Sequence, residues 1–313
     1  MTVGFKANWK TRFKKNVLSR WQLYLFLVIP IAHLVIFSYI PMLGAQIAFR
    51  RFNFVDGIWH SPWVGFDQFR RLIDLPIFGQ ILYNTLFVSI YGMIVGFTLP
   101  IILALMLNAF PFMKLKKTFQ TVSYIPHFIS VAVVVGMMMQ LFSPRIGGIG
   151  NLYYMMFGSL MPNLFASANA FPHLFVWSTV WQGLGWSSII YIAALSSIDP
   201  EQHEAAQIDG ASRFKRVLHI DLPGIKPTIV ILLILSFGSI MNVGFERAFL
   251  MQTPLNISRS EVIATYVYKV GMVFGVGDFS FATAIGLFNS GINFIMLLIV
   301  NFIAGKIGEQ RLL

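Results

Sequence analysis

Residues 199–227 read DPEQHEAAQIDGASRFKRVLHIDLPGIKP and lie between two long apolar runs. Asp199 is a good helix N-cap and Pro200 suits the first helical position, where its missing N–H costs nothing. Gly210 can adopt the left-handed conformation that ends a helix, and Ser212 can cap a second one. The segment therefore predicts a short helix–turn–helix, too small and too polar to fold alone.

Two roles fit this hairpin on local physics alone. Ala205 and Ala206 leave a narrow face on which another backbone can approach closely, which favours docking of a partner. Phe214, Val217 and Leu218 share one face at i, i+3 and i+4 spacing, which equally suits an amphipathic hairpin lying against a bilayer. The residues of the segment do not decide between these two readings.

The composition places the whole chain in a membrane. Its 313 residues are 57% apolar and 11% charged, with a mean hydropathy of +0.72, whereas a soluble domain carries about 25% charged residues. The net charge of +11 comes from basic residues that cluster at the ends of apolar runs. This pattern is typical of membrane orientation and argues against a nucleic-acid partner.

We predict an all-α membrane protein with six transmembrane helices. Each run is long enough for the roughly 20 residues that cross a bilayer, and prolines inside three of them predict kinks. The six spans are 21–40, 80–108, 119–142, 172–197, 225–245 and 281–304, and the prolines are Pro30, Pro100 and Pro126.

Charge distribution predicts that both chain ends lie inside. With the N-terminus in the cytoplasm, the inner segments 1–20, 109–118, 198–226 and 305–313 hold most of the 23 Lys and Arg residues, as the positive-inside rule requires. This topology leaves two long outer segments, 41–79 and 246–280. It also makes the 199–227 hairpin a cytoplasmic loop between the fourth and fifth spans.

The hairpin resembles the EAA loop of binding-protein-dependent ABC importer permeases. The matching residues are Glu204, Ala205, Ala206, Asp209, Gly210, Ala211, Phe214, Ile220, Leu222, Pro223 and Pro227. In that family the loop forms the coupling helices that fit a cleft on the nucleotide-binding subunit. The resemblance implies that Glu204 pairs with a basic residue of that subunit and that Gly210 forms the tight turn.

Other segments resemble the carbohydrate branch of this family, whose fold is the MetI-like transmembrane domain. They are VGFDQF at 64–69, NTL at 84–86 and SYIPHFIS at 123–130, and the last is similar to permeases for oligosaccharides or polysaccharide fragments. The likeness spans roughly 60–305. It divides the chain into 1–78 (basic tail, first span and outer loop), 79–305 (permease core with five spans) and 306–313 (cytoplasmic tail).

The resemblance also implies the partners. It implies a second permease subunit, more often in a heterodimer than a homodimer, two ATP-binding subunits and an extracytoplasmic solute-binding protein, all at a prokaryotic cell membrane. ATP and Mg belong to the ATPase, and this chain holds no cofactor. A permease for a peptide, an amino acid or another small solute is the main alternative. An ion-coupled secondary transporter is disfavoured, since no Asp or Glu falls clearly inside a span.

The sequence predicts no catalytic site in this chain. It contains no G-x-x-x-x-G-K-[ST] motif, so no phosphate cradle is available and ATP hydrolysis is expected on a partner chain. Its six histidines are scattered without an i, i+4 pair, and it has no Cys; a metal site is therefore not expected.

A saccharide pathway is predicted from polar and aromatic residues inside the spans. Aromatic rings stack on sugar faces, and amides hydrogen-bond to sugar hydroxyls. The candidates are Trp181, Trp186, Asn242 and Asn289. The alternative is that the amides join helices to one another and that the tryptophans form an interfacial belt.

Overall fold

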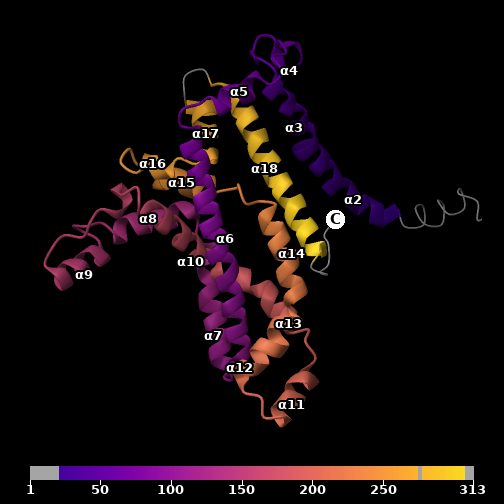
Figure 1. The fold of residues 1–313 in the computed structure, drawn as a ribbon, viewed down its shortest axis with the longest axis vertical. Coiled ribbons are helices and arrows are strands. Elements are labelled where there is room, and N and C mark those ends of the chain that lie inside the picture. Colours follow the sequence, from indigo (N-terminus) through magenta and orange to yellow (C-terminus); the bar gives the residue numbers. More distant parts are fainter. Residues whose placement is uncertain (1–20, 274–276, 307–313) are drawn as a thin grey trace, which may run out of the picture.

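A computed structural model describes residues 21–273 and 277–306 and contains helices joined by turns, with no named strand in those ranges (Figure 1). The elements are α2 Trp21–Leu34, η2 Val35–Tyr39, α3 Ile40–Met42, η3 Leu43–Phe49, α4 Gly57–His60, α5 Asp67–Ile73, α6 Phe78–Ala109, α7 Met113–Tyr124, η4 Ile125–Phe128, α8 Val131–Leu141, α9 Gly148–Phe157, η5 Leu164–Ala166, α10 Phe171–Leu195, α11 Pro200–Ile208, α12 Arg213–Arg216, η6 Val217–Asp221, α13 Leu222–Gly224, α14 Lys226–Phe237, α15 Phe245–Met251, α16 Ile257–Ser260, α17 Ile263–Tyr268, η7 Lys269–Val273 and α18 Phe279–Lys306.

Three helices are long and apolar enough to cross a membrane, and two bent pairs raise this number to as many as five. The three are Trp21–Phe49, Phe78–Ala109 and Phe279–Lys306. The fourth predicted span, 172–197, coincides with the single helix α10, which is not among these five candidates. The predicted basic tail at 1–20 and the tail at 307–313 lie outside the described residues.

The first predicted span continues past residue 40. Its helical path runs on to Phe49, so the long segment that follows it begins nine residues later than predicted from the sequence. Ala48 near the end of this path is fully buried, because this last part packs against α18. Burial there holds in helical form a stretch that the sequence pattern assigned to a loop.

The third predicted span, 119–142, is not one helix. Met113–Phe128 and Val131–Leu141 meet at 99°. Pro126 lies just before the break, and Ser130 caps the new helix by accepting a hydrogen bond from the Val133 N–H. The sequence predicted a kink at Pro126, and the structure shows instead a break after Phe128, beyond which a new helix begins at the Ser130 cap.

The fifth predicted span, 225–245, is interrupted as well. Helix α14 ends at Phe237, and turns lead to α15 at Phe245. The Met241 N–H inside this stretch donates to the Asn293 side-chain oxygen of α18 at 2.8 Å. An amide from a neighbouring helix thus satisfies the backbone that leaves the helix, which is the condition for irregular backbone inside a membrane.

Helices α6 and α10 form the centre of the bundle and lie side by side (Figure 1). Val88 of α6 packs with Phe175 and Val180 of α10 in one apolar cluster. Helix α7 reaches α10 at Gly185, where a Cβ atom would lie 2.2 Å from the Ser123 carbonyl oxygen. The α7–α10 contact therefore needs a residue without a side chain.

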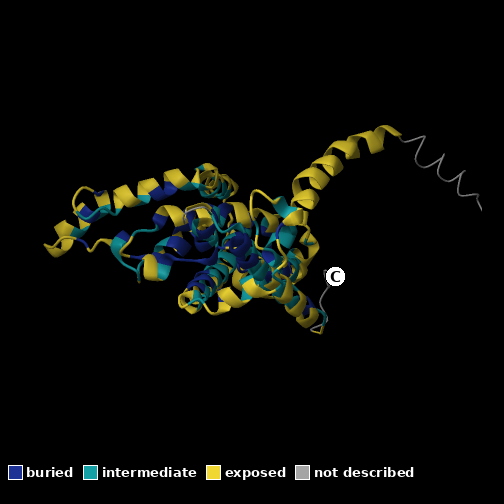
Figure 2. Ribbon diagram, turned by 90° about the horizontal axis from the view of Figure 1, so that it is seen from above, coloured by how far each residue is buried: buried dark blue, intermediate teal, exposed yellow. Residues whose placement is uncertain are grey.

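Two elements stand away from this centre. The helix that begins with α2 projects from the bundle with all of its residues from Trp21 to Met42 exposed, and α8 with α9 extends to the opposite side (Figure 2). Along the long axis, α11 and α12 occupy one end, called here the loop end, and α4 and α5 the other, called the rim end (Figure 1).

Candidate functional site

The hairpin at 199–227 has the local structure that its sequence predicts. The Asp199 side chain caps α11 by accepting the Glu201 N–H at 3.0 Å. Gly210 has φ +75° at the turn, a conformation that costs an L-residue roughly 1–2 kcal/mol. Ser212 caps α12 through the Lys215 N–H. Local capping fixes the shape of this segment independently of any partner.

None of the residues predicted to contact an ATPase is buried. Glu204, Asp209, Gly210 and Phe214 are exposed, and Phe214 keeps 71% of its surface accessible. Ala205 and Pro223 are also exposed, and Ala206, Ala211 and Leu222 are partly covered. The hairpin therefore presents Glu204 and Phe214 at the tip of the molecule, on a surface that also exposes the basic residues Arg213 and Lys215. Its contact with an ATPase remains a prediction.

A buried carboxylate holds the hairpin against the bundle. Asp221 is 2% exposed, and its Oδ1 lies 3.2 Å from His203 Nε2 of α11 and accepts the Asn108 amide of α6 at 3.2 Å. Burial raises the pKa of Asp221, while His203, Asn108 and Arg216 act in the opposite direction. One side chain thus joins α11, η6 and the end of α6.

A cavity of about 620 Å³ lies between α6, α10 and the interrupted segment after α14. Asn242 lines it, and its side-chain oxygen accepts the amides of Asn289 at 3.2 Å and Asn293 at 3.1 Å. Ser89 also lines it, with a buried hydroxyl that has no hydrogen-bond partner among the described residues. The structure brings Asn242 and Asn289 together beside this space.

The two tryptophans of the predicted saccharide pathway lie elsewhere on α10. Both are about half exposed, at 48% each, and neither belongs to the cavity wall. The Trp186 ring stacks on His127 with 4.4 Å between ring centres. A role for Trp181 and Trp186 in binding saccharide remains a prediction, and the same holds for the two asparagines.

The cavity wall carries one buried cation. Arg247 of α15 is 6% exposed, donates to Ser178 Oγ at 2.8 Å and also to Gln182 Oε1. Gln182 in turn donates to the Ile129 carbonyl at the break between η4 and α8. These bonds join α15, α10 and the bend of the third span.

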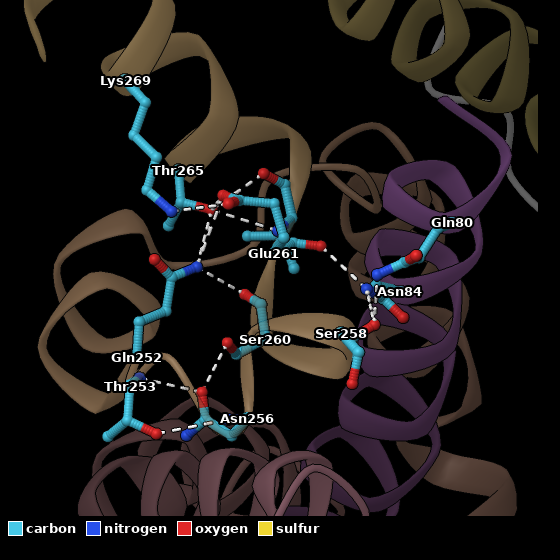
Figure 3. A network of polar contacts seen from close by, with 11 residues as sticks. Gln80, Asn84, Gln252, Thr253, Asn256, Ser258, Ser260, Glu261, Thr265 and Lys269 are labelled. Carbon is cyan, nitrogen blue, oxygen red and sulfur yellow. Dashed lines mark hydrogen bonds and ion pairs between the residues drawn. The ribbon is translucent and has the colours of Figure 1, made fainter. Parts of the chain in front are cut away.

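A polar network fixes the rim end (Figure 3). Asn84 of α6 donates to the carbonyls of Ser258 and Glu261, both at 3.0 Å. The Glu261 carboxylate accepts Lys269 Nζ at 2.5 Å and Thr265 Oγ1 at 2.6 Å. The Asn84 bonds attach α16 and the turn after it to the start of α6, and the Glu261 carboxylate joins that turn to α17 and η7.

Comparison with known proteins identifies the family to which this chain belongs. The family model described as "Binding-protein-dependent transport system inner membrane component" matches residues 96–309. The chain belongs to this family. Members are transport permeases, and the apolar helices of this permease agree with a place in a membrane.

Two relatives are similar over nearly their whole length. Protein LplB of Bacillus subtilis (strain 168) is 38% identical over 312 residues, which are 100% of this permease and 96% of the relative. The polygalacturonan/rhamnogalacturonan transport system permease protein YteP of the same strain is 37% identical over 308 residues, 98% and 95% of the two chains.

Two solved structures share the fold. A chain in the crystal structure of a bacterial ABC transporter involved in the import of the acidic polysaccharide alginate has 35% identity and a TM-score of 0.85, covering 95% of this permease and 99% of that chain. A chain of the bacterial alginate ABC transporter in complex with alginate pentasaccharide-bound periplasmic protein has 34% identity and a TM-score of 0.86, covering 96% and 100%.

Sequence reasoning about this permease did not single out Asp221, Arg247 or Glu261. Asp221 and Arg247 acquire their environments from partners far away in the chain, such as Asn108 for Asp221 and Ser178 for Arg247, whereas the Glu261 carboxylate bonds to residues within nine positions of itself. One signal was available for Asp221: it is a lone acid between the apolar residues Ile220 and Leu222 of a short helix, a position where a charge is costly unless it is paired.

Proposed function

We propose that the chain is the transmembrane permease subunit of an ATP-driven ABC importer for oligosaccharides or polysaccharide fragments. The observation that carries this proposal is the self-capped hairpin, which exposes Glu204 and Phe214 at the tip of the molecule and is joined to the central helix α6 through Asp221. Family membership of residues 96–309 supports the same conclusion.

The names of the relatives support a saccharide cargo. YteP is named for polygalacturonan and rhamnogalacturonan, and other relatives are named for arabinooligosaccharides and multiple sugars. The cavity agrees with such a cargo in size, since about 620 Å³ falls within the usual range of small-molecule sites. Asn242 and Ser89 on its wall offer an amide and an unpaired hydroxyl.

Six spans with both chain ends inside remain the proposed topology. In this proposal the six segments are the three long apolar helices, the bent pair Met113–Phe128 with Val131–Leu141, α10 and α14; the first half of the second bent pair, Arg213–Gly224, belongs to the cytoplasmic hairpin. In this orientation the loop end faces the cytoplasm, the rim end faces outward, and the permease is a multi-pass protein of the cell membrane.

The partners follow from the two ends of the molecule. Two ATP-binding subunits, which carry ATP and Mg, dock at the loop end, and a solute-binding protein delivers cargo at the segments 41–79 and 246–280. A periplasmic protein is present with the related alginate transporter. The first part of the helical path Trp21–Phe49, exposed from Trp21 to Met42, offers a surface for a second permease subunit in a heterodimer. This chain itself is non-catalytic and changes conformation when its partners bind and hydrolyse ATP.

Co-purification with the neighbouring ATPase tests the proposal. The wild type is compared with a Glu204→Arg, Gly210→Trp double variant and with Arg145→Glu, which reverses a charge in the exposed loop between α8 and α9. No atom lies within 4 Å of the position where a Gly210 side chain would begin, so the added ring meets no neighbour. The left-handed backbone at Gly210 (φ +75°) strains any other residue, so size-exclusion chromatography must first show that the double variant is folded.

The ATPase should accompany the wild type and Arg145→Glu but not the double variant. An ATPase that binds the double variant as well as the wild type, or that never binds the wild type, would refute the docking role of the hairpin.

A further inference from the structure

Arg247 is a buried cation on the wall of the 620 Å³ cavity. Its guanidinium donates only to neutral acceptors in the described chain, the Ser178 hydroxyl and the Gln182 amide oxygen. No carboxylate of the described residues lies within 4.0 Å of its nitrogens. A charge taken out of water in this way is costly unless an ion of opposite sign joins it.

Gln182 holds the guanidinium in one orientation. Its amide nitrogen donates to the Ile129 carbonyl at 2.5 Å, which directs its oxygen toward Arg247. A guanidinium has five N–H donors in a planar fork, and the Ser178 and Gln182 bonds occupy two of them. This geometry is suited to receiving a carboxylate, because the fork matches two carboxylate oxygens at once.

One acid shares the same cavity wall. Glu246 precedes Arg247 in α15 and lines the cavity, but its side chain is exposed. Water and salt screen an exposed charge, whereas a buried charge acts through a medium of low dielectric constant. The buried charge on this wall is therefore the cation Arg247, whereas the acid Glu246 is exposed to solvent.

We infer that this cavity binds saccharides that carry carboxylate groups, such as uronic acid residues, and that Arg247 is the residue that contacts the carboxylate. The unpaired Ser89 hydroxyl and the Asn242 amide on the same wall are available to sugar hydroxyls. This inference rests on the proposed import function and adds the charge of the cargo to it.

The test compares one glycan in two charge states. The complete transporter, with its ATPase and binding protein, is reconstituted in proteoliposomes. Initial uptake rates are measured for trigalacturonate and for its methyl ester at saturating binding protein. The variants are Arg247→Gln, which removes the charge, Arg247→Lys, which keeps the charge without the fork, and Arg145→Gln, a control that removes an exposed charge outside the cavity.

The expected result is a selective loss. Arg247→Gln should slow uptake of the acid by about tenfold or more, as expected for a lost charge-assisted hydrogen bond, and should leave uptake of the ester unchanged. Arg247→Lys should recover part of the acid rate, and Arg145→Gln should resemble the wild type.

Three outcomes would overturn the inference while leaving the import function intact. The first is that Arg247→Gln slows uptake of acid and ester equally, which would mean that Arg247 only holds α15 against α10. The second is that Arg247→Gln changes uptake of neither glycan. The third is that the wild type imports the ester but not the acid. A wild-type transporter that imports no saccharide at all would instead refute the proposed function.

Discussion

Replacing Gly185 by alanine should separate α7 from α10. The added Cβ would lie 2.2 Å from the Ser123 carbonyl oxygen and 2.4 Å from its carbon, and ordinary contact begins at 3.4 Å. Both obstacles are backbone atoms of a helix, so no side chain can turn away. The helices must part by about 1 Å, and overpacking of this kind costs roughly 1–3 kcal/mol.

Gly183→Ala is the matched control on the same helix. Its Cβ would meet nothing closer than Ser187 Oγ at 4.0 Å, so it should keep or slightly raise stability, since Ala is favoured over Gly inside a helix by about 1 kcal/mol. Both variants are heated in detergent at one scan rate, and the remaining monodisperse protein is followed by size-exclusion chromatography.

Gly185→Ala should lose its native elution peak several degrees below the wild type, and Gly183→Ala should not. Equal melting of the two variants would mean that the α7–α10 contact is looser than the structure shows. The comparison is independent of cargo and partners, because it depends only on packing inside this chain.

Two further substitutions test buried polar contacts. Asp221→Ala leaves the His203 and Asn108 groups without their acceptor and should increase hydrogen exchange in α11, whereas Asp221→Asn keeps the shape and should change it less. Burial raises the pKa of Asp221 above its ordinary 3.8, so the folded chain keeps this proton to a higher pH than the unfolded chain does. The stability of the wild type should therefore fall relative to that of Asp221→Asn as the pH rises from about 4 through the raised pKa. Parallel pH profiles of the two proteins would contradict this. Asn293→Leu removes the acceptor of the buried Met241 N–H and should lower stability by about 1–2 kcal/mol; an unchanged melting temperature would show that this N–H finds another partner.

Local signals in the sequence predicted the hairpin closely. Asp199, Gly210 and Ser212 act on backbone groups within three residues of themselves, so their effects do not depend on the rest of the fold. The resemblance to the EAA loop also rests on one short segment of the chain. It predicted the family whose model matches residues 96–309.

The interruptions of the spans required knowledge of distant partners. Pro126 indicated where the helix of the third span is interrupted. The 99° break also leaves backbone groups that need hydrogen-bond partners, and Gln182, 53 residues away, donates its amide to one of them, the Ile129 carbonyl. In the same way, Asn293 stabilises the unwound stretch around Met241. Hydropathy records only the apolar character of a run and cannot show whether the run is one helix or two.

Helix α6 connects the two ends of the molecule as one continuous helix, Phe78–Ala109, with Pro100 inside it. Asn84 fixes it to the rim, and Asn108, 24 residues further on, bonds to Asp221 of the hairpin. At 1.5 Å per residue these two amides are about 36 Å apart, so a tilt of about 5° around the rim would move Asn108 by about 3 Å. That displacement is comparable to the 3.2 Å Asn108–Asp221 contact itself. The hairpin must therefore either move with the Asn108 end of α6 or lose the Asn108–Asp221 contact. Helix α6 thus acts as a lever arm that turns about its Asn84 end.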